Sequence, residues 1–447
     1  MLKLAHRFVV LAATAAGAWF ATSPALAVPF TTTTGDPGSA DSYVQLGSTT
    51  NFGNATDVVI KDNGTGTTTR KGYLRFGLPE GGTTSASLDL TVSINNEGGV
   101  GVTPQTHSVN VWGLRDGNAG EAWIEGNGGA DNSPAGEIVF SNAPANVTTN
   151  NHFTSGAVFL GRYSVSNTAV GGVNTFNAGT LNMFLNEDTN GNATIMLQRN
   201  GGNSGHNLAY ASDEHATLAA PAISGNTAGV GLINITTGQG LGADTFVQQG
   251  SATTNFGSST DLTIKGGTGT TTRKIYLRYD LSSLAGTDAL GAALNFDVTL
   301  NNGGGTPAGP AEDFTVEVFG LLNGDPDELW NEATINWNNA PANTTDNNLV
   351  LAEVVSLGSF IVPASVAPYG VMFSSAALVD FINADTNGVA TFILRRSAGG
   401  SANLIFGSDE SSANAPRLSL LVAVPEPATG LLGLLSAMVL ARRRRAA

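Results

Sequence analysis

The sequence predicts an all-β protein built from two tandem antiparallel β-sandwich domains of jelly-roll type. Two observations carry this prediction. Apolar and polar residues alternate with period two, and the same landmarks recur at a constant offset along the chain. The composition agrees, because Gly, Asn, Thr and Ser are abundant and Lys and Glu are scarce, which is typical of short strands joined by turns. A hydrophobic content of 41% over 447 residues is sufficient for folded cores.

Period-two alternation is clearest at residues 87–95 and again at residues 294–300. Each segment places apolar residues on one face only, which predicts a half-buried antiparallel strand. Only residues 178–185 and 375–382 have a helical pattern, and each ends at an Asp-Thr-Asn-Gly turn. We therefore expect many strands and one short helix in each domain.

The body of the chain is a duplication of one unit of about 200 residues. An Asp-x-Tyr/Phe-Val segment, a Thr-Asn-Phe-Gly turn and an Arg-Lys-x-Tyr-Leu-Arg strand each occur twice, at an offset of 203 to 204 residues. The seam falls near residues 221–240, which are rich in Gly and poor in charge. We predict the first domain at residues 28–224 and the second at residues 225–423.

The N-terminal end has the three parts of a secretory signal peptide. Lys3, His6 and Arg7 are basic, residues 8–20 are apolar, and Ala25-Leu26-Ala27 forms an A-x-A cleavage site. We predict a signal peptide at residues 1–27, and hence export of the mature protein.

The C-terminal end, residues 424–447, has a different three-part pattern. Val424-Pro425-Glu426-Pro427 forms a rigid boundary, residues 428–441 are apolar, and Arg442-Arg443-Arg444-Arg445 follow. The apolar run predicts a short hydrophobic helix, well under the roughly 20 residues that span a bilayer. This tail resembles the PEP-CTERM sorting signal of Gram-negative bacteria that make extracellular polysaccharide. The resemblance implies transient insertion in the inner membrane, processing by an exosortase-type enzyme, and delivery to the cell envelope or extracellular matrix.

The charge of the body excludes several partners. The formal net charge is −15, but six of the 20 basic residues and none of the acidic residues lie outside residues 28–426, so that body has 14 basic and 35 acidic residues, a net of −21. Such a surface repels nucleic acid and anionic lipid. It also disfavours an anionic polysaccharide unless calcium bridges the two. The chain has no cysteine, so packing, and metal if any is bound, must supply its stability.

Several motifs of the body together resemble the DNRLRE domain, over nearly its whole length. They are the Asp-x-Tyr/Phe-Val opening, the Thr-Asn-Phe-Gly turn, the Arg-Lys-x-Tyr-Leu-Arg-Phe strand and a Trp-x-Glu…Ile-x-Trp-x-Asn-Ala-Pro segment starting at Trp330. The resemblance implies a β-sandwich module of secreted and surface proteins, some of which bind carbohydrate. The first copy departs from this pattern, because Phe140 replaces the second Trp of the segment and a Gly- and Asn-rich insertion follows Glu125.

Four residues are candidates for contact with a glycan, and each has a structural alternative. Arg75 and Arg278 lie mid-strand, where a buried Arg would pair with a carboxylate such as Glu214 or Glu410. Trp123 and Trp330 occupy equivalent positions and are core residues or platforms for a sugar ring.

We predict no cofactor, with a structural calcium ion as the alternative. The strand-opening Asp41 and the late Asp213 could hold it in the first copy, and Asp244 and Asp409 in the second. The Asn-x-Asp-x-Asn-Gly segments at residues 186–191 and 383–388 begin like a calcium loop but carry Leu where a bidentate Glu is needed, so we expect turns there.

No catalytic motif is present: the chain has no Cys, no G-x-S-x-G, no HExxH and no phosphate loop. We therefore predict a non-catalytic surface or matrix protein acting in adhesion or scaffolding with exopolysaccharide. The alternatives are a tandem carbohydrate-binding module that grips a specific glycan and, third, a glycan-active enzyme with paired carboxylates.

Overall fold

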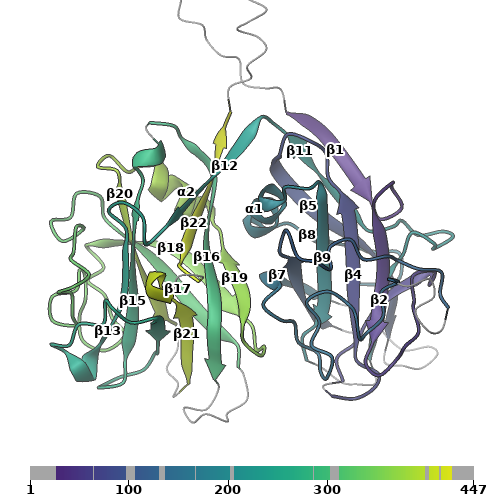
Figure 1. Ribbon diagram of the computed structural model, residues 1–447, viewed down its shortest axis with the longest axis horizontal. Coiled ribbons are helices and arrows are strands. Elements are labelled where there is room, and N and C mark those ends of the chain that lie inside the picture. Colours follow the sequence, from purple (N-terminus) through teal and green to yellow (C-terminus); the bar gives the residue numbers. More distant parts are fainter. Residues whose placement is uncertain are drawn as a thin grey trace, which may run out of the picture. The chain divides into compact units, whose positions relative to one another are not determined.

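The computed structural model describes residues 27–424 apart from nine internal gaps (Figure 1). The gaps are residue 64, 97–105, 130–135, residue 167, 202–205, residue 285, 303–311, 398–401 and 412–413. The predicted signal peptide and sorting tail lie outside the described residues, except for Ala27 and Val424 at their inner ends. Within the described part of the chain, no helix is both long enough and apolar enough to cross a bilayer.

The described elements form two lobes with the same order of strands and one helix each. The N-terminal lobe contains β1 (Val28–Thr33), β2 (Ala40–Gln45), β3 (Asp57–Ile60), β4 (Arg70–Gly77), β5 (Thr83–Asn96), β6 (His107–Leu114), β7 (Ala157–Val165), β8 (Val173–Phe176), α1 (Gly179–Glu187), β9 (Asn192–Arg199), β10 (Asn207–Ala211) and β11 (Ala222–Thr227). The C-terminal lobe contains β12 (Val230–Thr236), β13 (Ala243–Gln248), β14 (Asp261–Ile264), β15 (Arg273–Asp280), β16 (Ala289–Asn302), β17 (Phe314–Leu321), β18 (Val354–Val362), β19 (Tyr369–Phe373), α2 (Ala376–Asn383), β20 (Val389–Arg396), β21 (Asn403–Gly407) and β22 (Arg417–Ala423). Because β11 pairs with β1, the first repeat extends to Thr227.

Each lobe is a sandwich of two mainly antiparallel sheets, so the predicted all-β fold is confirmed (Figure 1). In the N-terminal lobe the order β1-β11-β5-β10-β3 faces the order β2-β4-β9-β6-β7. In the C-terminal lobe β12-β22-β16-β19 faces β13-β15-β20-β17-β18. The registers repeat as well: Asp41 lies opposite Leu74, and Asp244 lies opposite Leu277.

Alternation in the sequence predicts the core faces correctly except at Leu300, which is 37% exposed because the register of β16 shifts between Val298 and Leu300. Leu88, Leu90 and Val92 of β5 are fully buried, and so are Leu294 and Val298 of β16. Burial of side chains this size contributes about 1.5–3 kcal/mol each. The two α-helices are the two that the sequence predicts, displaced by one or two residues at their ends.

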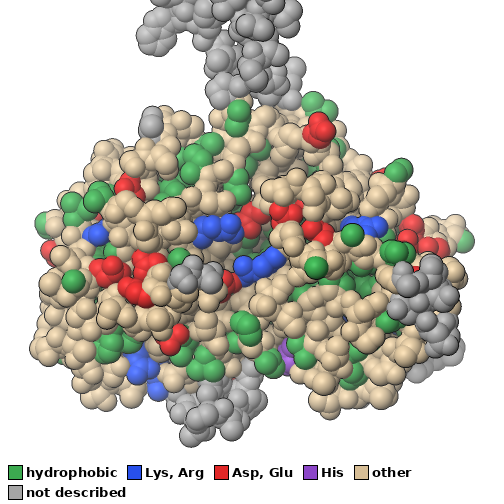
Figure 2. All heavy atoms as spheres, in the orientation of Figure 1, with side chains coloured by type: hydrophobic (Ala, Val, Ile, Leu, Met, Phe, Trp, Pro, Cys, Tyr) green, Lys and Arg blue, Asp and Glu red, His purple; other side chains and the backbone are tan. Residues whose placement is uncertain are grey.

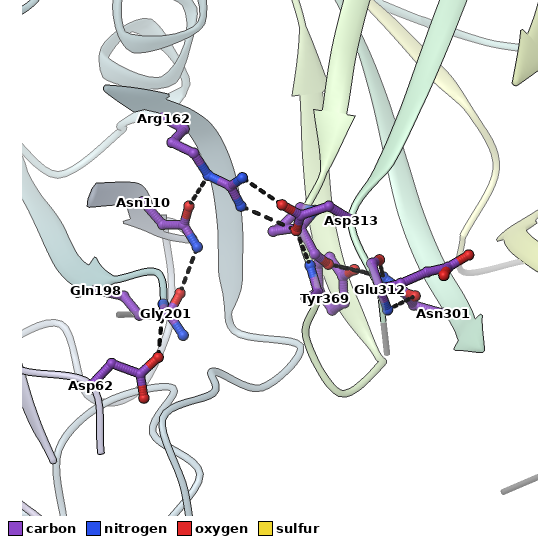
Figure 3. A network of polar contacts seen from close by, with 11 residues as sticks. Asp62, Asn110, Arg162, Gln198, Gly201, Asn301, Glu312, Asp313 and Tyr369 are labelled. Atoms are coloured by element: carbon purple, nitrogen blue, oxygen red, sulfur yellow. Dashed lines mark hydrogen bonds and ion pairs between the residues drawn. The ribbon is translucent and has the colours of Figure 1, made fainter. Parts of the chain in front are cut away.

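The two lobes share one continuous sheet and a polar network. β7 and β19 pair in parallel through Val158 and Gly370. Figure 3 shows Arg162 of β7 in a two-pronged ion pair with Asp313, at 2.5 and 3.1 Å, while its Nε donates to Asn110 at 2.6 Å. The guanidinium therefore holds a carboxylate of one repeat against an amide of the other.

A buried lysine recurs at the same place in each lobe. Lys274 Nζ donates to Asn343 Oδ1 at 2.7 Å and to the carbonyls of Thr344 and Asn348, and it lies 4.7 Å from the centre of the Trp337 ring. Lys71 makes the equivalent contacts with Asn146 and the His152 carbonyl, and lies near the rings of Phe140 and Phe153. The lysine thereby saturates the carbonyl groups of a loop that would otherwise be buried without donors.

Replacing Lys274 with Met should lower the free energy of unfolding by about 2–4 kcal/mol, because three buried acceptors lose their donor. Urea denaturation of the full chain measures this loss. Lys265→Met is the matched control at a half-exposed position nine residues earlier, and it should change the free energy by less than about 0.5 kcal/mol. Equal losses in the two variants would contradict a buried, hydrogen-bonded Lys274.

His107 makes the N-terminal lobe sensitive to acid. It is buried, its Nε2 lies 3.0 Å from Asn95 Oδ1, and burial, with Arg199 and His206 nearby, lowers its pKa to about 4. Between pH 6.5 and 4 the unfolded chain takes up a proton at this position that the folded chain does not, so stability is lost as the pH falls. The loss is about 3 kcal/mol over that interval. His107→Gln should lack this component when urea unfolding is compared at pH 7, 5.5 and 4, and an identical pH profile in both proteins would contradict it.

Candidate functional site

In each lobe the predicted site residues come from four separate segments and meet at one place. Asp41, Glu125, Asp213 and Glu214 each offer a carboxylate oxygen within 4.8 Å of the others, and so do Asp244, Glu332 and Asp409. We call these groups the N-terminal and C-terminal carboxylate clusters. Arg75 and Trp123 adjoin the first cluster, and Arg278 and Trp330 adjoin the second, as the contacts below show.

The buried aspartate at the second residue of β2 or β13 is the centre of each cluster. Asp244 Oδ2 accepts hydrogen bonds from Thr237 Oγ1 at 2.5 Å and from the Asp409 backbone N–H at 3.0 Å. Asp41 Oδ2 accepts the same pair of bonds, from Thr34 at 2.6 Å and from Asp213 at 3.0 Å. Both aspartates are only 1% exposed.

Close approach of two loops keeps these distances short. A Cβ placed on Gly35 would lie 3.3 Å from Asp213 Cβ, and one on Gly238 would lie 3.3 Å from Asp409 Cβ. A larger residue would push the late aspartate away from the strand, so the glycine that follows each threonine is part of the geometry.

A glutamate that follows the tryptophan by two residues completes each cluster. Glu125 Oε1 accepts from the Asp41 backbone N–H at 2.8 Å, and Glu332 Oε1 accepts from that of Asp244 at 2.8 Å. Each aspartate therefore accepts two hydrogen bonds through its side chain and donates one, from its backbone N–H, to the glutamate.

Arg75 and Arg278 form a wall of the cluster. Arg278 donates to the carbonyls of Leu241 and Trp330, and its guanidinium lies 5.0 Å from the centre of the Trp330 ring. Arg75 donates to the carbonyls of Gly38 and Trp123 in the same way. The nearest carboxylate that acts on each arginine is Glu125 or Glu332, in place of the predicted Glu214 or Glu410.

Burial raises the pKa of most carboxyl groups in the two clusters. It raises the pKa of Asp41 and of Asp244 to about 8, against the opposing effect of the threonine hydroxyl. Burial likewise raises the pKa of Glu125, Glu214 and Asp409 to about 7. Desolvation and mutual repulsion together make these groups costly to ionise without a positive partner.

The Asp-Thr-Asn-Gly segments are turns, as expected. Asp188 Oδ2 accepts from the Gly191 N–H at 2.6 Å, and Asp385 Oδ2 accepts from Gly388 at 2.7 Å, with both glycines at φ 79°. In the N-terminal lobe this turn also brings Asp188 close to Asp116 and Glu121. The Asn190 side-chain amide donates hydrogen bonds to the carboxylates of Asp116 and Glu121.

An open cleft of about 490 Å³ lies beside that turn. Its polar lining comes from both repeats and includes Arg115, Asp116, Glu121, Asp188, Asp297 and Arg417. Arg115 is ion-paired with Asp297, and Arg417 with Glu187 at 2.6 Å. Figure 2 shows acidic and basic side chains gathered in a band across one face of the body. The volume lies within the usual range of small-molecule sites.

No aromatic side chain is exposed among the described residues. Trp123 and Trp330 are each 6% exposed and pack edge-on against Tyr73 and Tyr276, at 6.3 Å between ring centres. Neither indole therefore presents a ring face to solvent.

Sequence reasoning did not select the glutamates or the threonines of the clusters. Glu125 and Glu332, and Thr34 and Thr237, recur in both repeats, as Asp41 and Asp244 do. Recurrence of the same polar residue at equivalent positions of the two repeats is the sequence signal that could have found them.

These features define a class: a duplicated β-sandwich protein with the same carboxylate cluster in each lobe. Residues 32–116 and 236–361 match the model of carbohydrate-binding module family 96, one match in each repeat. Together they cover just under half of the chain. The first match contains Asp41 and Arg75, and the second contains Asp244, Arg278 and Glu332.

Solved structures with some likeness include the following three. A recombinant N-glycanase F (PNGase F) is 12% identical with a TM-score of 0.22, covering 79% of this chain and 100% of its own. PNGF-II is 11% identical with a TM-score of 0.26, covering 86% and 65%. A β-porphyranase of glycoside hydrolase family 86 from Bacteroides plebeius is 10% identical with a TM-score of 0.19, covering 82% and 36%. Such low scores assign no shared activity. No curated protein matches the chain.

Trp330→Ala should lower the free energy of unfolding by about 3–5 kcal/mol, because it empties a buried site beneath Arg278. Trp330→Phe keeps most of the ring and should cost less than about 1.5 kcal/mol. Leu329, which is 63% exposed, provides the matched control, since Leu329→Ala should be nearly neutral in urea denaturation. If Trp330→Ala were as mild as Leu329→Ala, the indole would be free to stack on a sugar.

Proposed function

We propose that this protein binds carbohydrate without transforming it, as an exported component of the cell surface or extracellular matrix. The observation that carries the proposal is the match to a carbohydrate-binding module family in both repeats.

The open cleft supports this proposal, and we propose it as the place where the carbohydrate binds. Its carboxylates can accept hydrogen bonds from sugar hydroxyls, and Arg115 and Arg417 can donate them. Five of its lining residues are acidic: Asp116, Glu121, Glu187, Asp188 and Asp297. That excess favours a neutral glycan, or an acidic one bridged by cations.

The two ends of the chain supply the route to the matrix in this proposal. The signal peptide exports the chain, and the tail from Val424 to Arg445 inserts transiently in the membrane until an exosortase-type enzyme removes it. The protein would then act in adhesion or scaffolding among exopolysaccharide. A tandem module that grips one specific glycan is the alternative, and the family match favours it. A glycan-active enzyme ranks third, since the matched family is a binding module.

The purified full chain should bind polysaccharide in a glycan array and in sedimentation with insoluble polymers, with no release of reducing ends. Binding across many neutral glycans supports scaffolding, and binding to one structure supports the specific module. No binding to any glycan by a folded chain would contradict the proposal, and soluble product from a polymer would establish catalysis.

A pair of variants tests the cleft as the location. Asp116→Asn combined with Arg417→Gln should weaken glycan binding about tenfold, which corresponds to about 1.4 kcal/mol of lost polar contact. Asp261→Asn is the control at an exposed acid outside the cleft lining and should bind like the unmodified chain. Unchanged affinity in the cleft variant would place the glycan elsewhere on the lobes.

A further inference from the structure

We propose that each lobe binds one divalent cation, of which calcium fits best, at its carboxylate cluster. The proposal stands apart from glycan binding, because the clusters are built from residues that do not line the cleft. It assigns a structural role to the strand-opening aspartates and gives Glu125 and Glu332 a part in the site.

The distances suit an ion of calcium's size. Calcium takes six to eight oxygen ligands at about 2.3–2.6 Å, so oxygens on opposite sides of the ion are about 5 Å apart. The candidate oxygens within each cluster lie within 4.8 Å of one another. They can therefore face one ion without a large rearrangement, and water would complete the shell.

An oxygen without a partner points independently to a missing ligand. Asp244 is 1% exposed, and its Oδ2 holds both the Thr237 hydroxyl and the Asp409 N–H. Its Oδ1 is buried and has no hydrogen-bond partner. A buried carboxylate oxygen left bare costs free energy that a cation facing it would recover.

The donor set selects a hard cation. Every candidate ligand atom is a carboxylate oxygen, with no imidazole and no thiolate among them. The nearby arginines direct their hydrogen bonds to backbone carbonyls: Arg278 donates to Leu241 and Trp330, and Arg75 donates to Gly38 and Trp123. Three or four carboxylates in one place therefore hold enough negative charge for a dication.

The position explains what the ion would do. Asp244 lies in the sheet that contains β13, whereas Asp409 lies in the single-turn 3₁₀ helix Asp409–Ser411 that follows β21 of the opposite sheet. Glu332 comes from the loop between β17 and β18. One cation would thus cross-link both sheets and a long loop at a point where the structure otherwise has only a few hydrogen bonds.

Calcium titration of the full chain, treated with EDTA and then dialysed, tests the proposal. Isothermal titration with CaCl₂ should give two bound ions per chain. At a hundredfold excess over Kd the melting temperature should rise by about 5–10 °C. MgCl₂ should bind more weakly, because Mg²⁺ demands a tighter octahedral shell.

Isosteric variants separate metal binding from folding. Asp244→Asn should bind one calcium ion, and Asp41→Asn with Asp244→Asn should bind none, while Asp261→Asn should retain both. Without metal, the double variant should melt no lower than the metal-free parent, because it removes buried charge and keeps the shape. The proposal would be overturned by any of three results: no heat of binding in the titration with CaCl₂, equal melting temperatures in EDTA and in calcium, or two ions still bound by the double variant. The parent comparison in EDTA and calcium remains decisive if a variant fails to fold.

Discussion

The aspartate at the start of each sandwich is the constraint on which the rest of the site depends. Asp41 and Asp244 each receive a threonine hydroxyl and the N–H of a residue near the end of the same repeat. Their own N–H groups are taken by Glu125 and Glu332. The start, the middle and the end of the repeat are thereby tied to one buried side chain. Because a buried carboxylate tolerates few arrangements, it defines where the surrounding loops can lie.

Duplication shows which features the fold requires. The hydrogen bonds at Asp41 and Asp244, the wall made by Arg75 and Arg278, and the buried lysines recur with nearly the same distances. The N-terminal repeat has Phe140 where the C-terminal repeat has Trp337. Both rings pack near the buried lysine of their lobe, Phe140 near Lys71 and Trp337 near Lys274. That position serves the interior of the lobe in both repeats.

The described surface is mainly polar. All described aromatic rings are buried or half-buried, and Trp123 and Trp330 are among the buried ones. What remains is a polar cleft lined by acids and ion-paired arginines. Its side chains offer hydrogen-bond donors and acceptors, which are the groups that the proposed binding of a carbohydrate would use.

From the sequence alone, period two in residues 87–95 and 294–300, the two short helices and the repeat of landmarks determine the all-β duplicated fold. They do so because alternation reports directly which face of a strand is buried. The sequence also singles out Asp41, Asp213, Arg75 and Trp123 as unusual. Only the tertiary structure brings them together, since Asp41 and Asp213 are 172 residues apart: Asp41 lies in β2, whereas Asp213 lies in the loop that follows β10 of the opposite sheet. A local pattern records burial and turns, whereas the pairing of distant strands decides which carboxylates share one site.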